Sequence, residues 1–169
     1  DSFLGTGGTS NVTYALRHLG GTLDAFQNTF DPVGAVNSSY GYFCQSKGTA
    51  GLSSNLVSAG TSLYSYVAYY VPFVPQNNGC TVTADHNYFT LSGPRQNDEQ
   101  IDLLAGKNGN IDGGKVGCTV KPGDYHLAKG APCIDQGVDA TVLGAVVATD
   151  IDGKPRKAGA APDIGCSEL

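Results

Sequence analysis

Three blocks near the C-terminus decide the fold of this chain: Gly123-Asp-Tyr-His-Leu-Ala-Lys-Gly-Ala-Pro-Cys-Ile-Asp-Gln-Gly137, Thr149-Asp-Ile-Asp-Gly-Lys-Pro-Arg156 and Pro162-Asp-Ile-Gly165. They fall within residues 123–166 of a chain of 169 residues. Gly and Pro recur in all three blocks, as they do in turns. Each block also contains Asp, whose carboxylate accepts charged hydrogen bonds.

As a set, the blocks resemble the C-terminal end of extracellular bacterial right-handed parallel β-helix proteins, the pectate-lyase-like solenoids. In that family a segment reading roughly G-D-Y-H-L-x-x-G-S-P-x-I-D-x-G closes the last coils, and D-x-D-G-x-P-R followed by D-I-G forms a capping tail. The resemblance implies an all-β chain with β-helix coils over 1–137 and a C-terminal cap over 138–169. The aromatic and acidic ending that usually follows D-I-G is replaced here by Cys166-Ser-Glu168.

A cap is needed because the last coil of a solenoid exposes apolar core and an unpaired strand edge. We expect the tail to cover that end and to be held by charged hydrogen bonds. Asp150-Ile-Asp-Gly153 is similar to the beginning of a calcium loop, but the further ligands and the closing Glu of an EF-hand are missing. We therefore expect no cofactor, with calcium as the alternative. The side chains expected to hold the cap are Asp135, Asp150, Asp152, Arg156 and Asp163.

A loose repeat supports the solenoid. Gln27-Asn-Thr-Phe30, Ser54-Asn-Leu-Val57 and His86-Asn-Tyr-Phe89 each place Asn two positions before an apolar residue, and Ser10-Asn-Val-Thr13 is a weaker copy. The Asn residues are 27 and 32 residues apart, within the period of stacked repeats. Asn tolerates left-handed backbone and turns the chain. Stacked on its equivalents, it can also pair amides from coil to coil.

The tyrosines gather in residues 61–74. Read as a strand, this segment places Tyr64, Tyr66 and Tyr70 on one face, because side chains alternate across a strand. The favoured interpretation is that this row packs under a loop or against a neighbouring chain. The alternative is a sugar-stacking platform for a polysaccharide, since flat rings match the apolar faces of pyranoses.

Residues 92–117 are polar and rich in Gly, which predicts a long loop that leaves the coil near these positions. A carbohydrate-active enzyme, either a polysaccharide lyase or a glycosidase, needs paired carboxylates or a base on one face. No catalytic pattern is recognisable, so the catalytic residues are unknown. The sequence therefore favours a non-enzymatic role without deciding the question. The candidate acids and bases are Asp85, His86, Asp98, Glu99, Asp102 and Asp112.

The five cysteines lack the spacing of a zinc site, so disulfides in an oxidising compartment are the better interpretation. The expected pairs are Cys133 with Cys166 and Cys80 with Cys118, which leaves Cys44 over. Sequence alone does not fix this connectivity, and buried free thiols are the alternative.

Charge and hydropathy exclude two classes of function, nucleic-acid binding and membrane spanning. The net charge of -5 argues against nucleic acid as a partner, and no apolar run is long enough for a membrane span. The chain begins at Asp1 and contains no Met, so we expect a processed product whose N-terminal end meets the remainder of a longer precursor or a second chain. We expect a secreted or cell-surface β-helix module with a structural, adhesive or glycan-contacting role. The alternatives are part of an enzyme and a subunit of an extracellular oligomer or filament.

Overall fold

The computed structural model describes most of the chain. In residues 2–6, 12–13, 33, 64–70 and 114 only the backbone is described. Every regular element in the described part is a β-strand, so the protein is all-β there. The described ranges are 2–6, 12–33, 37–44, 47–58, 64–70, 80–90, 106–114, 116–121, 124–139 and 148–169.

The strands follow one another closely along the chain. Their bounds are β1 Ser2–Thr6, β2 Val12–His18, β3 Gly21–Phe26, β4 Thr29–Val33, β5 Ser38–Cys44, β6 Gly48–Ser53, β7 Leu56–Ser58, β8 Tyr64–Tyr70, β9 Thr81–Asp85, β10 Tyr88–Thr90, β11 Ile111–Gly114, β12 Thr119–Lys121 and β13 Asp124–Leu127. β12 and β13 form an antiparallel pair, whereas every other pairing between the described strands is parallel.

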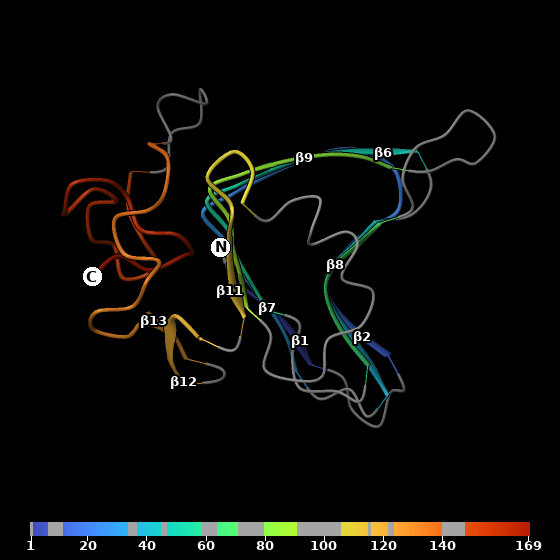
Figure 1. Cartoon of the computed structure of the whole chain (residues 1–169), viewed down its shortest axis with the longest axis horizontal. Helices are drawn as coiled ribbons and strands as arrows, with labels where there is room; N and C mark the ends of the chain where they lie inside the picture. The colour runs from blue at the N-terminus through green and yellow to red at the C-terminus, as the bar shows by residue number, and fades with distance from the viewer. Residues whose placement is uncertain are drawn as a thin grey trace.

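Three parallel sheets are visited in turn (Figure 1). Their strand orders are β1-β4-β7-β10-β11, β2-β5-β8 and β3-β6-β9, so each strand from β1 to β7 pairs with the strand three further along the chain. We call three consecutive strands, one in each sheet, a repeat. Register is kept between repeats: in the first sheet Phe3 pairs with Phe30, and Phe30 with Val57, which in turn pairs with Phe89.

The core lies between the inner faces of these sheets. Phe30, Val57 and Phe89 face it from the first sheet, Tyr42 from the second, and Leu52 from the third; all five are at most 1% exposed. Alternation along the strands explains which side chains face the core. In β6, Ala50 and Leu52 are buried, whereas Thr49, the residue before Ala50, is exposed. Burying such aromatic and aliphatic side chains contributes about 1.5–3 kcal/mol each.

A second apolar cluster covers the outer face of the first sheet. Leu56 and Tyr88 begin β7 and β10 and point away from the main core. They pack with Leu127, Cys133 and Ile164 from the C-terminal segment. The first sheet is therefore covered on both faces, which explains why β7 and β10 start with two successive apolar residues rather than with an alternating pattern.

In the described residues 148–169 the tail lies along this outer face rather than across the end of the last repeat, which corrects the expected position of the cap. Arg156 Nη2 donates to the Gln27 carbonyl, and Cys166 N donates to Thr29 Oγ1. Gly165 N donates to the carbonyl of Ser54, one repeat further along. In Figure 1 the C-terminal segment lies beside the strands of the first sheet. The tail buries the outward-facing apolar side chains of this sheet, which the sequence pattern does not indicate.

Part of the expected loop near 92–117 belongs to the first sheet. Residues 106–110 form turns, and β11 then pairs with β10 in parallel. The expectation of a loop throughout this region is therefore wrong for residues 111–114. Residues 91–105 lie outside the described part of the chain.

Two disulfides form, and they differ from the expected pairs. Cys44 bonds Cys80 and Cys118 bonds Cys133, with Cα–Cα distances of 6.3 and 6.2 Å, while Cys166 is a buried free thiol. Cys44 ends β5 and Cys80 immediately precedes β9 in the following repeat. The first bridge thus joins neighbouring repeats, a proximity that spacing along the chain does not report. Disulfides are typical of proteins in an oxidising environment.

Candidate functional site

Four buried Asn side chains form a ladder at the corner between the third and first sheets. The backbone N and Nδ2 of Asn28 donate to Oδ1 of Asn55, at 3.0 and 3.3 Å. Asn55 donates in the same way to Asn87, at 2.9 and 3.0 Å, and Asn87 donates to Asn110 at 2.9 Å from both groups. This Asn ladder confirms the pairing of amides between repeats that the sequence pattern predicted for the first three members.

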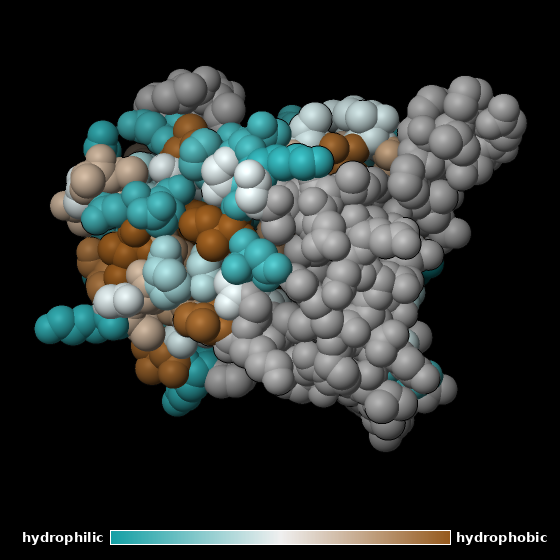
Figure 2. Space-filling view, viewed as in Figure 1, coloured by the Kyte–Doolittle hydropathy of each residue, from teal (hydrophilic) through white to brown (hydrophobic). Residues whose placement is uncertain are grey.

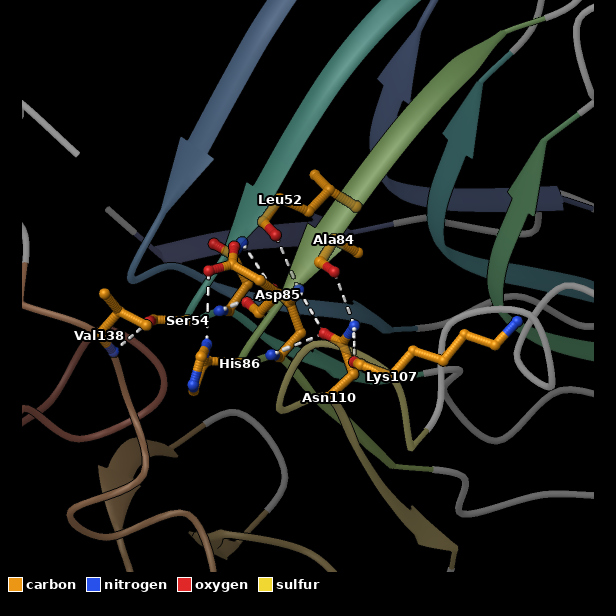
Figure 3. Close-up of polar contacts among 10 residues, drawn as sticks. Leu52, Ser54, Ala84, Asp85, His86, Lys107, Asn110 and Val138 are labelled. Carbon is orange, nitrogen blue, oxygen red and sulfur yellow. Dashed lines mark hydrogen bonds and ion pairs between the residues drawn. The ribbon is translucent and has the colours of Figure 1, made fainter. Parts of the chain in front are cut away.

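The backbone before each Asn explains why the chain turns there. Gln27, Ser54 and His86 have φ near +50°, and Gly109 before Asn110 has φ of 74°. This left-handed conformation turns the side chain of the next residue into the corner. Asn110 closes the ladder, because its Nδ2 donates to the carbonyls of Ala84 and Lys107 (Figure 3). Sequence reasoning missed Asn110.

Residues 148–169 of the tail have little regular structure, so carboxylates satisfy the backbone amides there instead. Asp150 accepts hydrogen bonds from the backbone N of Asp152, Lys154 and Glu168. Two further carboxylates act in the same way. Asp163 accepts from the amides of Asp135 and Leu169. Glu168 accepts from the amides of Ala158 and Asp163. Asp135 accepts from Ala161 N. Glu168 is a member that the motif did not indicate.

Arg156 is 6% exposed and lies near enough to Asp150, Asp163 and Glu168 for their charges to act on it, although its Nε and Nη1 have no hydrogen-bond partner among the described residues. Burial lowers the pKa of its guanidinium, whereas Cys166, Glu168, Asp150 and Asp163 act in the opposite direction. Burial also raises the pKa of the Asp163 and Glu168 carboxyls. The arrangement is therefore a buried charge cluster with one cation, which anchors the tail to the Gln27 carbonyl.

Asp152 is placed differently, in an exposed bridge to β13. His126 Nδ1 lies 2.7 Å from Asp124 Oδ1, and His126 Nε2 lies 3.1 Å from Asp152 Oδ1. Lys154 Nζ lies 3.4 Å from the other oxygen of Asp152. Ionised carboxylates only accept hydrogen bonds, so His126 must donate from both nitrogens and bridges them as the imidazolium. These hydrogen bonds raise the pKa of His126 and lower the pKa of Asp124 and Asp152.

This bridge predicts a pH window. The raised pKa of His126 gives stability that is complete below the ordinary value of 6.5 and is lost as pH rises through the folded-state pKa. The lowered pKa of both Asp carboxyls gives stability that is present above 3.8 and lost on acidification. His126→Gln should therefore lower the urea midpoint most at about pH 5 and least at about pH 9. Exposed Lys129 supplies the control: Lys129→Gln should give no such window, and a pH-independent effect of His126→Gln would contradict the bridge.

The predicted tyrosine row lies on β8, where only the backbone is described. Register pairs Tyr64 with Ser38, Tyr66 with Tyr40 and Tyr70 with Cys44. The side chains of the three tyrosines lie outside the described part, so the row remains a prediction. Neighbouring strands do hold an aromatic cluster that the sequence did not indicate: Tyr14 and Tyr40 stack with ring centroids 5.1 Å apart, and Phe43 meets both rings edge-on.

The candidate acids and bases of an enzyme are only partly described. His86 Nδ1 lies 3.4 Å from Asp85 Oδ2 on a partly exposed corner (Figure 3). Asp112 lies in β11, whereas Asp98, Glu99 and Asp102 lie outside the described ranges. Among the described residues, no group of three or more His, Cys, Asp or Glu side chains is placed to hold a metal ion. The described ranges likewise contain no helix long and apolar enough to span a membrane.

The surface of the C-terminal segment mixes polar and apolar groups. Figure 2 shows hydrophobic residues interspersed among hydrophilic ones over this segment. Large exposed hydrophobic side chains include Val120 of β12 and, in the tail, Ile151 and Leu169.

Comparison with protein-family models, with curated proteins and with solved structures gives no match.

Proposed function

We propose that this chain is a right-handed parallel β-helix that serves as a structural module of a secreted or cell-surface protein. The regular return of the chain to three parallel sheets supports the β-helix, and connections between parallel strands are right-handed in nearly all proteins. The observation that carries the structural role is the Asn ladder, which ties four successive corners together inside the core. The two disulfides fit export to an oxidising compartment.

The aromatic cluster favours the structural role over glycan stacking. Tyr14 and Tyr40 stack with an angle of 16° between their planes, so each ring covers a face of the other. Arg17 Cζ lies 5.1 Å from the centroid of the Tyr14 ring and occupies a ring face through a cation–π contact. A pyranose needs an open ring face, and the stacking and cation–π contacts of this cluster occupy such faces. We propose that the cluster stabilises neighbouring repeats.

Polysaccharide binding and stability, measured on the same variants, test this role. Tyr40→Ala should lower the free energy of unfolding by about 2 kcal/mol, through lost packing and stacking. Calorimetry with soluble xylan, pectin, mannan and β-glucan should show no binding to the native chain. The proposal is contradicted if the native chain binds one of these polysaccharides and a folded Tyr14→Ala variant loses that binding.

We also propose a partner at the outer edges of β1, β2 and β3, either the remainder of a longer precursor or a second chain. These strands end their sheets, and in the described ranges nothing pairs with their outer edges. At the opposite end β8, β9 and β11 are the last strands of their sheets, and the donors of Asn110 are bonded there within the chain to Lys107 and Ala84. Native mass measurement tests the point: a defined oligomer, a self-assembly of this chain or a second fragment supports a partner, whereas a lone monomer contradicts the proposal.

A further inference from the structure

A buried imidazole lies against one sulfur of the Cys44–Cys80 disulfide. His18 Nδ1 is 3.4 Å from Cys44 Sγ and 3.3 Å from Tyr42 Oη. His18, Tyr42 and Cys44 are each less than one-tenth exposed, and Cys80 is 2% exposed. The sequence did not indicate this group, because His18 and Cys44 lie on neighbouring strands, β2 and β5, and meet only through register.

The hydrogen bonds fix the tautomer of His18. Its Nε2 lies 2.9 Å from the Gly20 carbonyl, which can only accept, so Nε2 carries the proton. In the neutral ring, Nδ1 then presents a lone pair to the Tyr42 hydroxyl and to Cys44 Sγ. Burial raises the pKa of Tyr42, so the phenol keeps its proton and donates to Nδ1. An oriented basic nitrogen thus lies beside a sulfur atom.

Gly48 leaves the space in which these groups meet. A Cβ at this position would lie 2.7 Å from His18 Cε1 and 2.8 Å from Cys44 Sγ. The titratable groups that the described side chains bring to Cys44 are His18 from β2 and Tyr42 from its own strand. Tyr70 of β8 pairs with Cys44 in the strand register, but only the backbone of Tyr70 is described.

We propose that His18 and Cys44 form a latent imidazole–thiol pair, so that opening of Cys44–Cys80 by a small thiol makes Cys44 a nucleophile that takes up small disulfides. The thiolate of the small thiol attacks Cys80 Sγ, the S–S bond breaks, and its electron pair passes to Cys44 Sγ. A second small thiol releases Cys80, so two thiols are oxidised to one disulfide and the protein gains two electrons and two protons. The new Cys44 S–H faces Nδ1, which can take its proton and leave the reactive thiolate. The thiolate then attacks a small disulfide and forms a mixed disulfide, expelling one thiolate.

Cys80→Ser exposes the pair without a reductant. In this variant, with the fold checked by circular dichroism, the ultraviolet absorbance of the thiolate should show Cys44 ionising at least one pH unit below about 8.5, the value of an ordinary thiol. Adding His18→Gln, which keeps a donor for the Gly20 carbonyl but supplies no base, should return the titration to about 8.5 or above. Burial raises the pKa of Cys166, the other free thiol, so it stays out of this window. Equal titrations with and without His18 would overturn the proposal.

A second variant protects the test against misfolding of His18→Gln. Tyr42→Phe in the Cys80→Ser background removes the hydroxyl that occupies Nδ1, so the thiolate fraction at neutral pH should rise rather than fall. Oxidised glutathione supplies an independent readout by mass: its mixed disulfide at Cys44 should form about tenfold more slowly with His18→Gln, in line with a one-unit change in ionisation. An unchanged rate together with an unchanged Tyr42→Phe titration would contradict the pair.

Discussion

Asn87→Ala is expected to lower the free energy of unfolding by about 4 kcal/mol, because it removes five side-chain hydrogen bonds and leaves buried partners unsatisfied. Asn87 is fully buried. Its Oδ1 accepts from N and Nδ2 of Asn55, and its Nδ2 donates to Asn110 Oδ1 and to the carbonyls of Leu52 and Asp85. Domains of this size are stable by about 5–15 kcal/mol, so one substitution should remove a large part of the stability.

Urea unfolding followed by circular dichroism measures this loss. The control is Asn37→Ala, which makes the same chemical change at an exposed position and should alter stability by less than about 0.5 kcal/mol. Asn87→Asp keeps one acceptor but sets a buried carboxylate oxygen against the three acceptors of Nδ2, so we expect a loss at neutral pH at least as large as for Asn87→Ala, which shrinks as pH falls and the carboxyl regains a proton. A loss below about 1 kcal/mol for Asn87→Ala would argue that the ladder does not bind the repeats together.

Arg156→Met is expected to release the tail, with a loss of about 3–4 kcal/mol, as for other broken buried charge clusters. Met replaces the length of the side chain but neither donates to the Gln27 carbonyl nor neutralises Asp150, Asp163 and Glu168. Limited proteolysis should then cleave first within residues 148–169. The matched control is Lys157→Met, since Lys157 is the exposed neighbour of Arg156 in the same segment.

The pH dependence of this variant has a defined sign. The pKa values of Asp163 and Glu168 are raised in the fold above 3.8 and 4.5, so the folded state binds more protons and loses stability as pH rises. Arg156 lowers both pKa values, and its removal should increase that loss. The difference between Arg156→Met and the native chain should therefore be larger at pH 7 than at about pH 4. A difference that grows toward acid pH would show that the carboxylates do not carry the effect.

The Asn ladder shows how far the sequence leads. Asn28, Asn55 and Asn87 each stand two residues before an apolar side chain that enters the core, so both the period and the pairing were predictable. Asn110 is followed at the same distance by Asp112, which is not apolar, and it lies in a polar segment. Its membership depends on a turn and on pairing with β10, which local sequence does not report.

The tail motif did not indicate the surface that the tail contacts. Asp135, Asp150 and Asp163 accept hydrogen bonds from backbone amides and Arg156 donates to Gln27, whereas Asp152 bridges to His126. The tail docks on the outer face of the first sheet because Leu56 and Tyr88 present apolar side chains there. In the sequence each of them stands next to an apolar core residue, so the pattern alone does not show that it faces outward. The disulfide pairs were wrong for a similar reason, because Cys44 and Cys80 become neighbours only when repeats stack in register.

Hydrogen exchange of the Asn side chains tests the central claim most directly. In the native chain, the Nδ2 protons of Asn55 and Asn87 and the backbone amide protons of Asn28, Asn55 and Asn87 should exchange only through global unfolding, because each is buried and bonded to the next repeat. The exposed side chain of Asn37 should exchange freely. Exchange of the ladder protons as fast as those of Asn37 would contradict a buried ladder between stacked repeats.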